Sequence, residues 1–99
     1  MQFQKAKNPG RAIITVTGKN RPGIVAAFSK ILAQEQVDIN DLSQKILDGD
    51  LFVMMIVGSL EQSRITLLQL RESLHRQGEN MGLQVSVHHE KLFQYLNRI

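Results

Sequence analysis

The spacing of apolar residues changes period along the first third of the chain. Residues 11–17 are nearly continuous in β-branched and apolar side chains, which predicts a buried strand. Over residues 21–35 the apolar positions recur every three or four residues, which predicts an amphipathic helix. Asn20 is suited to cap that helix, and Pro22 is tolerated in its first turn. The expected buried stripe of the helix is Ile24, Val25, Phe28, Ile31 and Leu32.

Residues 37–47 return to alternation, with one slip in parity. Val37 and Ile39 share one parity, and Leu42 and Ile46 share the other. A one-residue slip of this kind predicts a β-bulge or a delayed strand start near Asn40.

The next elements follow from turn residues and from a second helical pattern. Asp48-Gly49 predicts a tight hairpin turn. Residues 51–57 are apolar on both faces, which predicts a central strand that is covered on both sides. A helical pattern over residues 61–77 is expected to end at Gly78 as its C-cap. Clean alternation over residues 83–88 predicts the last strand.

The resulting element order is β-α-β-β-α-β followed by a short amphipathic helix over residues 91–99. This order predicts the ferredoxin-like α+β fold, a four-stranded antiparallel sheet with both main helices on one face. The other face of the sheet needs a cover, which the C-terminal helix or a second subunit is expected to supply. We expect one domain over residues 11–90, preceded by a flexible leader over residues 1–10.

Composition removes several classes of site. The 99 residues contain no cysteine, which excludes a disulfide framework, a cysteine-ligated zinc and a thiol nucleophile. The start of the chain lacks the apolar core of a signal peptide, and residues 51–57 are too short an apolar run to cross a bilayer. A cytoplasmic protein with no membrane partner is therefore expected.

The charge pattern does not point to nucleic acid. The net charge is +3 at pH 7, with lysines and arginines scattered along the chain and no acidic residue between positions 5 and 30. That basic bias is compatible with an anionic ligand, but a solvated surface explains it better. With one tyrosine and no tryptophan, the stacking platform of an RNA-binding split βαβ domain is missing.

We find no catalytic constellation, P-loop or dinucleotide fingerprint, and we expect no catalytic residue, no metal and no cofactor. His88 and His89 are neighbours in a strand, so they point to opposite faces and cannot share one ion unless the strand bends. The enzyme alternative is an acylphosphatase-like hydrolase that would use Arg21 and Asn40. The signature of that family around the arginine is absent, and Asn40 opens its strand instead of closing it.

The connection between the first strand and the first helix is the best candidate for a binding site. Exposed N–H groups at the start of a helix attract carboxylates and phosphates. Gly23 has no Cβ, so a ligand could approach the backbone closely. A βα connection without any ligand accounts for the same residues.

Two segments resemble those of a known family. Residues 18–25, GKNRPGIV, resemble the Asp-Arg-Pro-Gly-Ile-Val signature of ACT domains, and residues 38–44 resemble the segment that follows their first helix. The resemblance spans about residues 11–90. It is greatest to small stand-alone ACT proteins related to the glycine cleavage system transcriptional regulator and to the N-terminal domain of formyltetrahydrofolate deformylase. Asn20 stands where the family usually has an acid.

The resemblance implies a non-enzymatic regulatory homodimer that binds a small amino acid or a similar carboxylate metabolite between its subunits. Arg21 and the helix N–H groups would hold the carboxylate of the ligand, and Asp41 its ammonium group. The regulatory effect would pass through a partner protein or through dimer rearrangement. The alternative is an interaction adaptor without a small ligand. Carried over onto this sequence, the site comprises Asn20, Arg21, Pro22, Gly23 and Ile24 in the turn and Asn40, Asp41, Leu42 and Ser43 in the facing strand.

Overall fold

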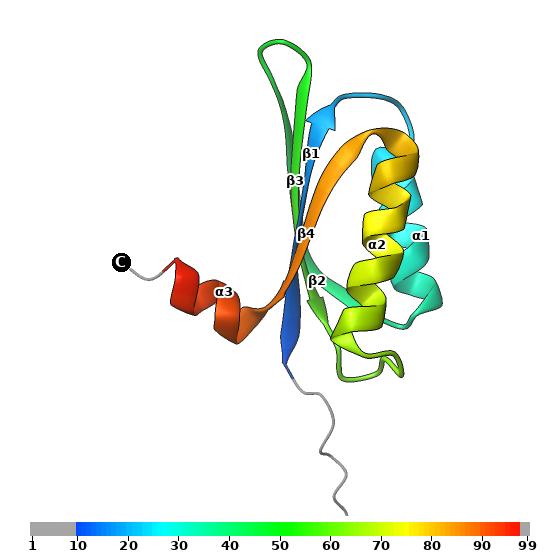
Figure 1. Cartoon of the computed structure of the whole chain (residues 1–99), viewed down its shortest axis with the longest axis vertical. Coiled ribbons are helices and arrows are strands. Elements are labelled where there is room, and N and C mark those ends of the chain that lie inside the picture. Colours follow the sequence, from blue (N-terminus) through cyan, green and yellow to red (C-terminus); the bar gives the residue numbers. More distant parts are fainter. Residues whose placement is uncertain (1–9, 98–99) are drawn as a thin grey trace, which may run out of the picture.

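The computed structural model describes residues 10–97 as one sheet with helices on both of its sides (Figure 1). Apart from Gly10, the expected leader lies outside the described residues. In chain order the elements are β1 (Arg11–Lys19), α1 (Ile24–Gln34), β2 (Asp38–Leu47), β3 (Leu51–Ser59), α2 (Leu67–Met81), β4 (Leu83–His89) and α3 (Glu90–Leu96).

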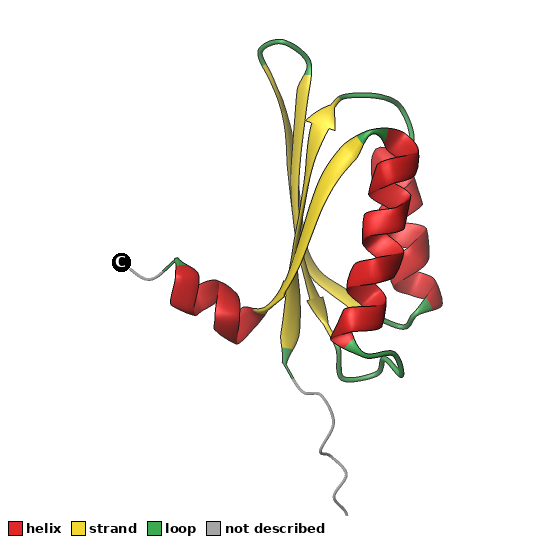
Figure 2. Ribbon diagram, in the orientation of Figure 1, coloured by secondary structure: helices red, strands yellow, loops and turns green. Residues whose placement is uncertain are grey.

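The four strands lie in the order β2-β3-β1-β4, and all neighbours are antiparallel. Helices α1 and α2 cover one face, and α3 leaves the sheet on the opposite side, which we call the open face (Figure 2). This arrangement confirms the predicted ferredoxin-like α+β fold.

The core lies between the sheet and the pair α1 and α2. Even-numbered residues of β1 and β3, such as Ile14 and Met54, point towards the helices and are almost fully buried against Phe28 and Leu74. Each such side chain contributes about 1.5–3 kcal/mol of transfer free energy when it leaves water. Odd-numbered residues point to the open face, where Met55 is exposed. Residues 51–57 of β3 were predicted to be covered on both sides, and within a single chain this prediction is therefore wrong.

Helix α1 begins later than the sequence predicts. Its N-cap is Gly23, at φ 89°, and no side chain caps it. Asn20 instead donates its backbone N–H to the carbonyl of Asp50 at 2.9 Å, which extends the pairing at the end of β1. Asn20 is therefore not the helix cap, because three further residues are needed to turn the chain.

Helix α2 is also displaced relative to the prediction over residues 61–77. It starts after Thr66, whose hydroxyl accepts the N–H of Gln69 at 3.0 Å while the Gln69 side chain accepts the N–H of Thr66 at 2.9 Å. This reciprocal pair is a capping box. The C-cap is Gly82, at φ 71°, so the prediction of Gly78 as the cap is wrong.

The hairpin between β2 and β3 has the expected position and a longer turn. The register shifts between Ile39 and Asp41, which confirms the predicted bulge. Leu47 pairs with Leu51, so three residues form the turn in place of the expected two. Both Gly49 and Asp50 have positive φ, at 81° and 64°.

Helix α3 is tied to the domain at its base. His89 caps it by accepting the N–H of Lys91 on Nδ1 at 3.1 Å. Glu90 binds Arg11 through Oε1, which lies 2.9 Å from Nη2 and 3.0 Å from Nε. None of its seven residues is buried, so the expected packing of this helix on the domain is only partly met.

Candidate functional site

The turn between β1 and α1 presents its polar groups to solvent. Arg21, Pro22 and Gly23 are exposed, whereas Ile24 is buried and fixes the helix start in the core. The helix pairing begins with the N–H of Ala27, which donates to the carbonyl of Gly23 at 3.0 Å. The N–H groups before it are those that the first turn of a helix leaves without intrahelical partners.

The second half of the predicted site lies on β2, an edge strand. Asp41 pairs with Val57 and Ser43 pairs with Met55, so both side chains lie on the open face. Leu42 points towards the helices and is half-buried, and Asn40 sits at the bulge.

One chain does not bring the two halves together. Ser43 lies level with Thr15, and the turn begins five residues further along β1. Five residues of strand span about 16 Å, and two strand spacings between β2 and β1 add about 10 Å sideways. Asn40 lies further from the turn than Ser43 does, so the distance between Arg21 and Asn40 is larger still. A single chain therefore cannot place both on one phosphate, as the acylphosphatase alternative requires.

Two charges of the predicted site have no partner among residues 10–97. Neither Arg21 nor Asp41 makes a side-chain hydrogen bond or an ion pair there, and both are exposed. They are therefore available to charged groups of a ligand or of another subunit.

A hollow that the sequence does not predict begins at Gly23 and runs between α1 and α2. It has a volume of about 550 Å³ and is lined by Ala26, Ala27, Lys30 and Gln77, among others. The adjacent alanines are the signal in the sequence, because small side chains on the outer side of α1 leave room beside α2. Lys30 places a positive charge in this hollow.

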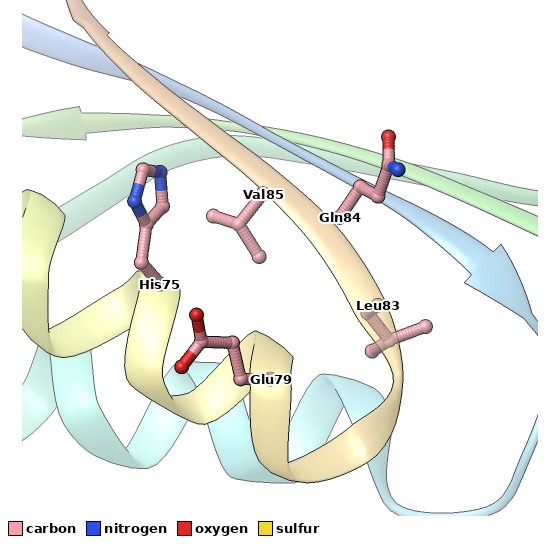
Figure 3. A pocket seen from close by; sticks show the side chains of 5 residues that line it. All are labelled: His75, Glu79, Leu83, Gln84 and Val85. Atoms are coloured by element: carbon pink, nitrogen blue, oxygen red, sulfur yellow. The ribbon is translucent and has the colours of Figure 1, made fainter.

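A second hollow lies on the other edge of the sheet, between α2 and β4 (Figure 3). His75 and Glu79 are one helical turn apart on α2 and face Val85 across it. Two potential ligands are fewer than a metal site needs. Across residues 10–97, no three histidine, cysteine, aspartate or glutamate side chains gather to hold a metal. In the same range, no helix is long and apolar enough to cross a membrane.

Comparisons with known proteins agree on one family. A model of the ACT domain matches residues 11–88. A UPF0237 protein of Methanopyrus kandleri is 40% identical over 89 residues, which cover 90% of this chain and 98% of that protein. A UPF0237 protein of Listeria monocytogenes is 33% identical over 89 residues, which cover 90% and 99%.

Solved structures share the fold. An ACT domain protein from Streptococcus pneumoniae superposes with a TM-score of 0.76 at 33% identity, covering 88% of this chain and 97% of that one. A putative glycine cleavage system transcriptional repressor has a TM-score of 0.71 at 19% identity, covering 89% and 51%. A formyltetrahydrofolate deformylase from Burkholderia mallei has a TM-score of 0.73 at 21% identity, covering 82% and 28%. The match to the family model, the shared fold and the relatives that align over nearly their whole length all lead to the same conclusion. The chain belongs to the ACT domain family.

Proposed function

We propose that this protein is a non-enzymatic regulatory homodimer that binds a small amino acid or a similar carboxylate metabolite between its subunits. The observation that carries the proposal is the turn over residues 20–24, where Arg21, which has no partner among residues 10–97, stands beside the start of a helix. Two proteins with the same fold are regulatory by name, the putative transcriptional repressor and the regulatory subunit of aspartate kinase from Thermus flavus, which has a TM-score of 0.59.

The chemistry of the turn suits an α-carboxylate. The guanidinium of Arg21 can bind both carboxylate oxygens at once, and unpaired N–H groups of α1 add donors and a favourable dipole. A Cβ built on Gly23 meets no atom within 4 Å, so the space beside the backbone is open to a ligand. Asn20 is neutral and does not repel an anion there.

The ammonium group of the ligand requires the second subunit. Asp41 is the free carboxylate of the predicted site, and it lies too far from Arg21 in the same chain to share a small molecule with it. A neighbouring copy supplies it in our proposal. Strand β2 is a ten-residue edge strand with mostly exposed side chains, and such edges readily accept a second chain.

The proposal is tested by a thermal-shift screen of the twenty amino acids and of common carboxylate and phosphate metabolites, with the mass of the assembly measured in parallel. A ligand at 100 times its Kd stabilises the folded protein by about 2.7 kcal/mol, which is readily detected. We expect one compound to raise the melting temperature in a concentration-dependent manner. The Arg21→Ala variant should abolish that shift without loss of stability, because Arg21 has no partner among the described residues.

Arg64→Ala is the matched control, since Arg64 is an exposed arginine beside the C-terminal end of α1, at the opposite end of that helix from the turn. It should retain the full shift. A shift that persists in Arg21→Ala would place the ligand elsewhere, and a flat screen on the intact assembly would leave the adaptor as the function.

A further inference from the structure

The hollow between α1 and α2 includes Gly23, the last residue of the turn before α1 begins. The two helices lie next to each other on the same side of the sheet, and α1 starts at the end of the sheet where β1 leads into the turn (Figure 1). A Cβ built on Gly23 meets no atom within 4 Å, so the space beside this residue is open. A ligand held at the turn therefore has the hollow directly beside it.

The hollow has the size and the apolar groups of a small-molecule site. Its volume of about 550 Å³ lies within the range of about 300–1,000 Å³ that is typical of ligand pockets. Ala26, Ala27 and Ile31 of α1 line it with aliphatic side chains. Such a lining suits the methylene groups of a ligand side chain.

The polar lining of the hollow suits an anion. Among the described residues that line it, Lys30 is the only charged one, and Gln34 and Gln77 add amides that can donate hydrogen bonds. Lys30 is exposed and makes no hydrogen bond or ion pair within residues 10–97. A negatively charged group that enters the hollow therefore meets one cation and no carboxylate in this lining.

The spacing along α1 fits a ligand with two acid groups. The Cα of Lys30 lies about 10 Å along the helix axis from that of Gly23, at about 1.5 Å per residue. Helical side chains lean towards the N-terminus, so the flexible four-carbon stem of Lys30 can bring its ammonium group closer to the turn. The outer carbons of an extended five-carbon diacid are four bonds of about 1.5 Å apart, or roughly 5 Å. One carboxylate can therefore bind at the turn while the other reaches Lys30.

We propose that the ligand is a dicarboxylic amino acid of the size of aspartate or glutamate, with its side-chain carboxylate in the hollow. This inference rests on the proposed function, because it takes the α-carboxylate to be held at the turn by Arg21. Lys30 then pairs with the side-chain carboxylate, and a neutral side chain of the same shape lacks that ion pair. Asp41 of a neighbouring copy stays available for the ammonium group.

Matched pairs of amino acids test this assignment by thermal shift. Glutamate and glutamine have almost the same shape and differ in side-chain charge, and so do aspartate and asparagine. We expect one acid to stabilise the protein at a concentration about fivefold lower than its amide does, the factor that suits a partly exposed ion pair. High salt should reduce this preference, because it screens exposed charges.

Variants of Lys30 connect the preference to the hollow. Lys30→Gln should remove the difference between acid and amide, and Lys30→Arg should keep it, because arginine retains the charge. Lys91→Gln is the matched control, since Lys91 is an exposed lysine of α3, which lies on the opposite side of the sheet (Figure 2). It should keep the full preference.

Filling the hollow gives a second measurement. Ala26 is exposed on α1, and leucine is a good helix former, so Ala26→Leu should stay folded while its larger side chain blocks the acid. Ala33→Leu is the matched control, because Ala33 is exposed on the same helix and does not line this hollow. We expect the shift to be lost in Ala26→Leu and kept in Ala33→Leu.

The outcomes separate this inference from the proposed function. An amide that binds as tightly as its acid, a preference that survives Lys30→Gln, or a full shift in Ala26→Leu would overturn the inference. If the shift in those cases is still lost in Arg21→Ala, the proposed function stands and only the class of ligand is wrong. A shift that needs Lys30 and survives Arg21→Ala would overturn both, since the ligand would then lie in the hollow alone.

Discussion

Gly78 of α2 packs directly onto Val85 of β4. A Cβ built on Gly78 would lie 2.6 Å from Cγ2 of Val85 and 3.0 Å from the backbone carbonyl oxygen of Leu83. This close approach lets the helix rest on the edge of the sheet, and any larger residue must push the two elements apart.

Gly78→Ala is therefore expected to destabilise the protein by about 1–3 kcal/mol, the usual cost of overpacking. Helix propensity alone predicts the opposite sign, because alanine in a helix interior is about 1 kcal/mol more favourable than glycine. Urea unfolding monitored by circular dichroism distinguishes the two. A gain in stability would mean that α2 can move off β4 at little cost.

Gly23→Ala should cost about 1–2 kcal/mol for a different reason. Gly23 has φ 89°, a conformation that is strained for residues with a Cβ, yet its surroundings are empty. Gly23→Asn should lose less, because asparagine tolerates positive φ better. Equal losses in the two variants would point to a steric cause. The same strain means that a bulky substitution such as Gly23→Val tests ligand approach only after its stability has been measured.

The general fold could be predicted from the sequence because each strand and helix carries its own apolar period. The ends of the helices could not, because one residue type serves several purposes. Gly78 has the spacing of a helix cap and is instead a packing position, while Gly82 is the cap. Asn20 has the chemistry of a cap and instead continues the sheet through Asp50.

The candidate site could be predicted only as two separate halves. The residues of the turn are contiguous, so a short motif identifies them. Whether Arg21 meets Asp41 depends on the strand order and on a second subunit, which no local pattern encodes. The base of α3 is likewise bonded to β1 through Arg11 and Glu90, which are 79 positions apart in the chain.

The capping box of α2 is a third point at which stability can be tested. Thr66→Ala removes the hydroxyl that accepts the N–H of Gln69, and it should cost about 0.5–2 kcal/mol. Gln69→Glu is the matched control, because glutamate can accept the N–H of Thr66 in the same way. Thermal unfolding should show a lower melting temperature for Thr66→Ala only. If Thr66→Ala matched the wild type, the first turn of α2 would draw its stability from packing alone.

The contact between Glu90 and Arg11 ties the base of α3 to β1. Glu90 accepts the backbone N–H of Arg11 at 3.2 Å and one hydrogen bond from its guanidinium Nε, and it forms an ion pair with Nη2, so one carboxylate ties the helix base to β1. Glu90→Gln keeps the size of the side chain and removes its charge. Because such partly exposed pairs contribute about 1 kcal/mol or less, we expect the melting temperature of the domain to change little. Hydrogen exchange in α3 should nevertheless become faster, since the helix makes few other contacts with the domain.

Lys91→Gln removes a neighbouring charge on the exposed side of the same helix and serves as the control. Unchanged exchange in Glu90→Gln would show that α3 is held by another contact.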